Sequence, residues 1–283
     1  MRIAHFHECL QQLDTAWIEG RVRSAIRGYQ LAVVPDAERA HILANQLALS
    51  ARPMVVPNFP MRDHTTAAAA RTRDAREPFT VIYCGSLGVQ QKLDLVIRSI
   101  PEWPAHARFA IVGNANSTEG EKLRAIAREV GVDTRVDFEG WLDYAHVPAR
   151  LARADLAIAL LDPAFEQWRT ALGASNKRYE YMRAGLPQIG DMNPGVGEML
   201  EGQGIGRCLG AFTTAELAAI VTDYADDPSR CRAEGEKAYR LHLEKYNYPS
   251  AFQPVLDWIS AHPPSRESAG RAAARPSARP DAA

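Results

Sequence analysis

The sequence of 283 residues has few cysteines and no long apolar run, and each absence excludes a class of protein. Its four cysteines form no Cys-x-x-Cys pair, and none lies near a histidine at the spacing of metal ligands. No apolar run approaches the length of a membrane span, and the opening MRIAHFHECL shows no secretory signal. We therefore expect a cytoplasmic protein in a reducing compartment, with peripheral contact to a membrane surface left open.

The sequence also lacks an excess of charge of either sign. The formal net charge is -1, which argues against a nucleic-acid-binding protein that works through a basic field. Hydrophobic residues make up 46% of the chain and charged residues 24%, so a substantial core can form. The length suits one large domain or two ordinary ones.

What the sequence does contain is a regular alternation of short apolar runs with amphipathic helical stretches. Runs such as TVIY and LAIALL are continuously apolar, which is typical of strands covered on both faces. Asp36 is placed to cap one helix at its start, and Gly131 to end another. This alternation predicts βαβ units, a parallel sheet and a doubly wound, Rossmann-like domain from about residue 78 to residue 246.

Ligands of such sheets bind beyond the carboxyl ends of the strands, so the loops that follow strands are the places to search. CGSLGVQQK follows the first strand of this domain. Its glycines, Gly85 and Gly88, would let the backbone approach a phosphate, with Ser86 and Lys92 close by. A Gly-x-x-Gly turn is also common where nothing binds, and the sequence leaves both interpretations open.

The next two loops bear on the kind of ligand. IVGNANSTEG is not Gly-x-Gly-x-x-Gly, and no acidic residue stands at the usual offset, which disfavours a dinucleotide-dependent oxidoreductase. FEGWLD follows the third strand, and there Gly140 and Trp141 could form a wall for a planar base. Trp141 could equally cover the edge of the sheet.

The stretch GASNKRYEYMRAGLP, residues 173–187, predicts a short helix that Ser175 can cap. The start of a helix attracts anions through its free N–H groups, and Lys177 adds a charge. Glu180 follows one turn later and could accept two hydroxyl groups, such as those of a ribose. The alternative is that Glu180 only pairs with Lys177, as most surface glutamates do with a neighbouring cation.

Together these motifs resemble the glycosyltransferases of the GT-B fold, in the group with a retaining, nucleotide-sugar-dependent domain. The resemblance runs from about residue 79 to residue 259, and SNKRYEYMRAGLPQIGDMNPGVGEMLEGQGIG is its most specific part. AHFHE, LAVVPDAERAHIL and VVPNFP look like the later part of the family's N-terminal domain. The resemblance implies an α/β protein of GT-B type, with a complete C-terminal and a partial N-terminal Rossmann-like domain, so that the chain begins about halfway through the acceptor domain.

The resemblance also implies boundaries along the chain. We expect a partial acceptor-side domain over residues 1–60, a linker over 61–78 and the nucleotide-sugar-binding domain over 79–248. A helix that crosses back to the first domain follows over 249–262, and a disordered tail over 263–283.

In activity, the resemblance implies a hexosyltransferase-like enzyme that moves a sugar from a nucleoside diphosphate such as UDP or GDP to a glycan, lipid or small-molecule acceptor. The family stabilises the leaving diphosphate with side chains and helix dipoles, so neither a metal nor a further cofactor is expected. His7 would lie beside the transferred sugar. The residues implied to bind the donor are Gly85, Ser86, Lys92, Gly140, Trp141, Leu142, Asn176, Lys177 and Glu180.

Three positions depart from the family's pattern. A second glutamate is usual eight positions before Glu180, where this chain has Leu172. A basic residue is usual where Ser86 stands, and another near Gln91, one place from Lys92. These departures support an alternative function, in which the chain is a catalytically inactive remnant that binds a nucleotide-sugar or acts as a scaffold.

Overall fold

The computed structural model describes residues 2–7, 16–26, 28–64 and 77–263. It divides into two compact units, one formed by residues 1–56 and 252–283 and the other by residues 57–251. Most of the expected linker and nearly all of the expected disordered tail lie outside the described residues, and the domain boundaries stay predictions.

The first unit contains a small parallel sheet of three strands in the order β1-β2-β3. Asp36 caps α2 as expected, because its carboxylate accepts the Glu38 N–H at 2.8 Å. A small apolar core lies between the sheet and the helices, formed by Ile26, Val34, Ala40, Leu43 and Leu47. The elements are β1 (Ile3–His5), α1 (Ala16–Ile26), β2 (Leu31–Val34), α2 (Ala37–Leu47) and β3 (Met54–Val55).

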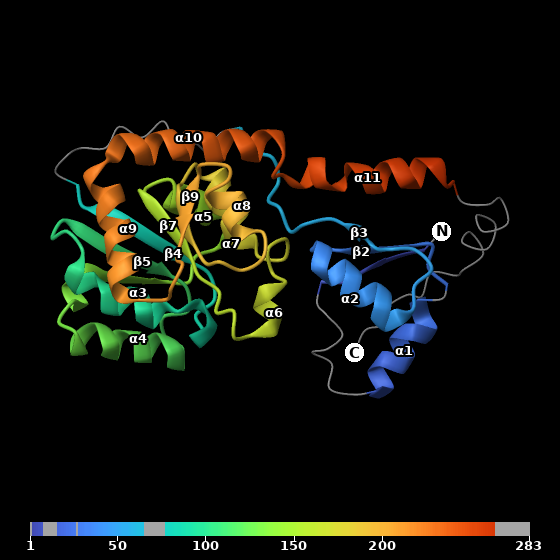
Figure 1. The fold of residues 1–283 in the computed structure, drawn as a ribbon, viewed down its shortest axis with the longest axis horizontal. Coiled ribbons are helices and arrows are strands. Elements are labelled where there is room, and N and C mark those ends of the chain that lie inside the picture. The colour runs from blue at the N-terminus through green and yellow to red at the C-terminus, as the bar shows by residue number, and fades with distance from the viewer. Residues whose placement is uncertain (1, 8–15, 27, 65–76, 264–283) are drawn as a thin grey trace, which may run out of the picture. The chain divides into compact units, whose positions relative to one another are not determined.

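The second unit is built on a six-stranded parallel sheet in the order β6-β5-β4-β7-β8-β9. Figure 1 labels β4, β5, β7 and β9 of this sheet and the helices around them. From the central strand β4 the chain adds strands outward to β6, then returns to the other side of β4 and adds three more. The strands are β4 (Phe79–Cys84), β5 (Ala107–Val112), β6 (Val136–Gly140), β7 (Leu156–Ala159), β8 (Gln188–Gly190) and β9 (Gly206–Cys208). This is the predicted doubly wound sheet.

Helices cover both faces of this sheet, which explains why its strands are apolar on both sides. In β4, Val81 and Tyr83 pack with α3, α4 and α9, whereas Ile82 faces α5 and α7. The helices of this unit are α3 (Leu93–Ser99), α4 (Thr118–Glu129), α5 (Val147–Leu151), α6 (Glu166–Arg169), α7 (Asn176–Arg183), α8 (Val196–Leu200), α9 (Thr214–Asp226) and α10 (Pro228–Glu244). A last helix, α11 (Tyr248–Ala261), begins in this unit and continues into residues assigned to the other.

Two details of the helices bear on the sequence predictions. Gly131 follows α4 with a φ of 73° and ends that helix as expected, and Gly185 follows α7 with a φ of 70° and ends it in the same way. The stretch 162–174, for which the sequence shows no helical pattern, contains the short helix α6. Four residues are too few to show the periodicity by which a helix is recognised in a sequence.

Candidate active site

The point at which the strand order reverses is where open parallel sheets bind ligands, and here it lies between β4 and β7. The loops that follow these two strands are in contact. The Asp162 N–H donates to the Gln90 carbonyl at 2.9 Å, and the Asp162 carboxylate pairs with Lys92 Nζ at 2.6 Å. Lys92 therefore lies at the expected edge of the sheet, but Asp162 already balances its charge.

The loop after β4 has a compact backbone. Gly85 has a φ of 150°, and a Cβ added to Gly113, just after β5, would lie only 2.4 Å from the Gly85 carbonyl oxygen. The Tyr83 hydroxyl donates to the Ser86 carbonyl at 2.5 Å, while Ser86 itself is exposed. This tightness fits both interpretations of the sequence, a phosphate-binding loop and a simple turn.

The start of α7 differs from the prediction in one respect. Ser175 occupies the capping position, but its side chain makes no capping hydrogen bond, so the expected cap is wrong. The Ser175 N–H donates to the Ala171 carbonyl at 2.8 Å and so closes the turn that precedes the helix. Asn176, the first helical residue, is exposed. The beginning of α7 thus carries no capping side chain, which is the condition under which it can receive an anion.

Lys177 extends from α7 to the loop after β4. Its Cε would lie 3.1 Å from a Cβ on Gly85, and its Nζ lies 5.4 Å from the centre of the Tyr83 ring. Burial, with the Arg178 guanidinium as the second cause, lowers the pKa of Lys177 to about 8. The structure therefore brings Lys177, Gly85 and the adjacent Ser86 together at the carboxyl end of β4.

A buried ion pair beneath α7 escaped the sequence analysis. Arg178 Nη2 lies 2.5 Å from Asp191 Oδ2, and both side chains are almost fully buried. The Asp191 carboxylate also accepts the N–H groups of Leu161, at 2.8 Å, and Asn193, at 3.0 Å. This network ties α7 to the loops after β7 and β8. An aspartate directly after a strand, in PQIGD, was the signal available in the sequence.

Glu180 is not the exposed partner of Lys177 that the alternative interpretation describes. It is buried, with an exposed fraction of 7%, and its Oε2 lies 2.5 Å from Arg183 Nη2. Its Oε1 accepts a hydrogen bond from the Tyr144 hydroxyl. Burial raises the pKa of Glu180, whereas Tyr144 and Arg183 act in the opposite direction. Neither partner was predicted from the sequence, because Tyr144 lies 36 positions away and no local signal marks Arg183 as buried.

The loop after β6 presents the residues expected to flank a base. Gly140 ends the strand with a φ of 78°, and its carbonyl accepts the Gly113 N–H at 2.9 Å. Trp141 is 70% exposed, which is the opposite of what covering the sheet edge would require. Leu142 is partly buried against the core on the α5 and α7 side. One face of the indole is therefore accessible.

His7 belongs to the first unit, where it follows β1. It is exposed, its ring lies 4.3 Å from the ring of His5, and its carbonyl accepts a hydrogen bond from Arg39 Nη1 at 2.5 Å. Its placement beside a transferred sugar stays a prediction.

Leu172 stands where the resemblance leads one to look for a second glutamate. Its carbonyl accepts the Tyr179 hydroxyl at 2.9 Å, and its side chain packs with the apolar cluster around Met182 and Val196. A Cβ on Gly195 would lie 2.5 Å from Leu172 Cδ2. The position is therefore part of the apolar packing and carries no charge.

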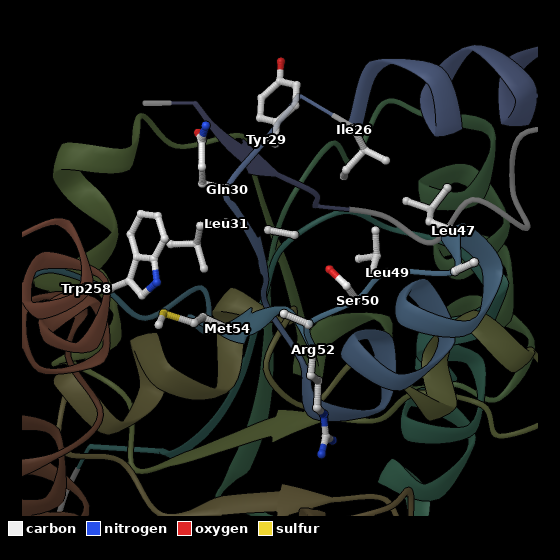
Figure 2. A pocket seen from close by; sticks show the side chains of 13 residues that line it. Ile26, Tyr29, Gln30, Leu31, Leu47, Leu49, Ser50, Arg52, Met54 and Trp258 are labelled. Atoms are coloured by element: carbon white, nitrogen blue, oxygen red, sulfur yellow. The ribbon is translucent and has the colours of Figure 1, made fainter. Parts of the chain in front are cut away.

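A separate cavity of about 450 Å³ lies in the first unit, at the amino ends of β2 and β3. Figure 2 shows its lining, in which Trp258 and Met54 lie near one another and the side chains of Ile26 and Leu47 come from the two helices. None of the residues predicted from the sequence lines it. Because ligands of open parallel sheets bind at the opposite, carboxyl edge, we do not assign this cavity to the candidate site.

Among the residues that the structure describes, no group of three histidine, cysteine, aspartate or glutamate side chains is placed to hold a metal ion. Every helix in the same part of the chain is too short or too polar to cross a bilayer.

Comparison with known proteins adds a family match. The family model described as Glycosyl transferases group 1 matches residues 78–227, more than half of the 283-residue chain. The comparison with curated proteins gave no significant match.

Solved structures of similar fold cover nearly the whole chain. Alr3699/HepE from Anabaena, in complex with UDP and glucose, has a TM-score of 0.71 at 16% identity, over 92% of this chain and 71% of its own. Sucrose-phosphate synthase from Thermosynechococcus elongatus has a TM-score of 0.69 at 14% identity, over 92% and 67%. WaaG, a glycosyltransferase involved in lipopolysaccharide biosynthesis, has a TM-score of 0.66 at 15% identity, over 91% and 74%. These likenesses confirm the predicted GT-B fold.

Proposed function

The chain belongs to the family Glycosyl transferases group 1, and from this membership we propose that it transfers a sugar from a nucleoside diphosphate to an acceptor. The observation that carries the proposal is the meeting of three features at the reversal point of the sheet. These are the uncapped start of α7, the amino group of Lys177 and the tight backbone at Gly85.

The diphosphate would lie against these three features. Departure of the sugar leaves negative charge on the diphosphate, and a helix start together with a lysine stabilises that charge in a partly dehydrated site. The hydroxyl of Ser86 and the exposed Asn176 would complete the contacts. Lys92 would act more weakly, because Asp162 pairs with it.

The nucleoside would lie further along α7, beyond the diphosphate. Glu180 lies one turn into the helix and would accept the ribose hydroxyls, and Trp141 would stack on the base between Gly140 and Leu142. HepE and its UDP and UDP-glucose complexes make uridine the first base to test.

The rest of the reaction follows the family resemblance. The sugar would be transferred with retention of configuration to a glycan or lipid-linked glycan, with His7 beside the sugar and without a metal or further cofactor. The apolar packing of Leu172 removes one carboxylate that the family commonly uses. This observation favours, as the second candidate, a protein that binds the donor without transferring its sugar.

The test is calorimetric titration of UDP, followed by an assay for hydrolysis of UDP-glucose. Glu180→Gln keeps the volume of the side chain while removing the charge, and it should weaken UDP binding strongly. Glu129→Gln is the matched control, since Glu129 is also ion-paired, with Arg98, but lies exposed at the end of α4. Equal UDP affinity in the two variants would show that Glu180 does not hold the ribose. Binding without hydrolysis or transfer would favour the second candidate.

A further inference from the structure

The carboxylate of Glu180 is occupied in the unliganded protein. Its Oε1 accepts the Tyr144 hydroxyl, and its Oε2 is covered and lies beside Arg183. A ribose presents two hydroxyl donors, and because Oε2 is covered, both would have to reach Oε1, which has two lone pairs. The Tyr144 hydroxyl already uses one of these lone pairs, so the nucleoside that the proposed function assigns to Glu180 meets an oxygen with room for only one further donor.

The two neighbours of Glu180 differ in how firmly they are held. Arg183 is on the same helix and 7% exposed, so moving it would leave a charge unpaired inside the protein. Tyr144 is 63% exposed and starts the single-turn helix Tyr144–His146, beyond the end of β6. Rotation of its side chain disturbs little packing. Tyr144 is thus the partner that a ligand can displace.

The contact between Tyr144 and Glu180 is strong enough to matter for binding. A hydrogen bond from a hydroxyl to a carboxylate is stronger than one between neutral groups. Burial, with the Glu180 carboxylate as the next cause, raises the pKa of Tyr144 to about 12, so the hydroxyl keeps its proton at neutral pH. The Arg183 guanidinium lies 5.7 Å from the centre of the Tyr144 ring, a contact that phenylalanine would retain.

We propose that the Tyr144 hydroxyl occupies the ribose-binding oxygen of Glu180 in the unliganded protein and leaves it when a nucleoside diphosphate binds. This inference rests on the proposed function and adds a residue that sets its specificity. A ligand with a ribose diol exchanges one hydrogen bond on Glu180 for another, whereas a ligand without the diol has nothing to exchange. Tyr144 thereby lowers the affinity for every ligand that uses Glu180.

The test compares a ribonucleotide with its dideoxy form on the wild type, on Tyr144→Phe and on a control variant. UDP, GDP and ADP, and the 2′,3′-dideoxy form of whichever binds, are titrated calorimetrically into the wild type and Tyr144→Phe. The variant should bind the ribonucleotide about fivefold more tightly, which corresponds to about 1 kcal/mol. The dideoxy ligand should bind equally to both proteins. Tyr224→Phe is the matched control, because it removes another tyrosine–glutamate hydrogen bond, to Glu234 at 2.6 Å, and should leave affinity unchanged.

Each outcome decides the matter. Unchanged or weaker ribonucleotide binding by Tyr144→Phe overturns the inference and leaves the proposed function standing, since the wild type still binds. An equal gain for the dideoxy ligand also overturns it, because the hydroxyl would then act independently of the ribose. If the wild type binds none of the three nucleotides, the proposed function fails and the inference fails with it. Urea unfolding of Tyr144→Phe confirms that the variant is folded.

Discussion

Replacing Lys177 by methionine should stabilise the protein at neutral pH and remove its affinity for nucleoside diphosphates. Burial lowers the pKa of Lys177 to about 8, and no carboxylate among the described residues forms an ion pair with its amino group. A buried cation without a carboxylate partner lowers the free energy of unfolding. The diphosphate of the proposed donor would provide the missing counter-charge, so the same residue that weakens the fold would strengthen binding.

The size of the effect follows from the pKa. A lowering from 10.5 to about 8 corresponds to about 3 kcal/mol, at about 1.4 kcal/mol for each pKa unit. Two terms reduce this value. The side chain is partly exposed, so water screens part of the cost, and the contact with the Tyr83 ring contributes about 0.5–1 kcal/mol that methionine would lose. We expect Lys177→Met to gain about 1–2 kcal/mol in the free energy of unfolding.

The gain should depend on pH in a definite direction. Below pH 8 both the folded and the unfolded protein hold the proton, and the wild type bears the full cost of the buried cation. Between pH 8 and 10.5 the folded protein releases the proton first, so the unfolded state binds more protons and wild-type stability rises with pH. The advantage of Lys177→Met should therefore be full at pH 7 and smaller at pH 9.5.

Urea unfolding of both proteins at the two pH values, with calorimetric titration of UDP at pH 7, tests this reasoning. A variant less stable than the wild type at pH 7 would refute the electrostatic argument. A gain of equal size at both pH values would assign the effect to packing. Undiminished UDP binding would remove Lys177 from the diphosphate site.

Three further predictions concern neighbouring residues. Arg178→Met should lower the free energy of unfolding, measured with urea, by about 3–5 kcal/mol, because it leaves the buried Asp191 carboxylate without its cation. A decrease below about 1 kcal/mol would contradict this prediction. Gly113→Ala should weaken UDP binding measured by calorimetry, since its Cβ would displace the carbonyl of Gly85; unchanged affinity would place the loop outside the site. Lys92→Met should weaken UDP binding less than the Lys177 variant does, because a carboxylate already pairs with Lys92, and the reverse order would make it the main contact.

Much of the fold could be read from local signals. Continuous apolar runs such as TVIY predicted strands buried on both faces, and β4 is such a strand. Asp36 caps its helix, and Gly131 and Gly185 end theirs, because these signals act over a few residues and need no distant partner. The reversal of strand order could also be predicted from the sequence, because short βαβ connections and their right-handedness leave few possible topologies.

The candidate site was predictable as a set of loops but not as a set of contacts. Ser175 has the residue type and the extended backbone of a helix cap, yet its side chain makes no capping hydrogen bond. Glu180 was predicted as a ribose-binding residue, and the structure shows that its neighbours are Arg183 and Tyr144 and not Lys177. Lys92 looked like a free cation until the loop after β7 supplied a partner.

The sequence by itself determined the type of fold, the loops that form the site and the residue types in them, because periodicity, capping and glycine conformation are properties of neighbouring residues. Only the tertiary structure decided which charges are paired and which carboxylate oxygen is occupied. The reason is physical: the free energy of a buried charge depends on groups brought near it by other strands and helices. Tyr144 follows β6 and Glu180 lies on α7, 36 positions along the chain, so only the folded protein brings the two side chains together.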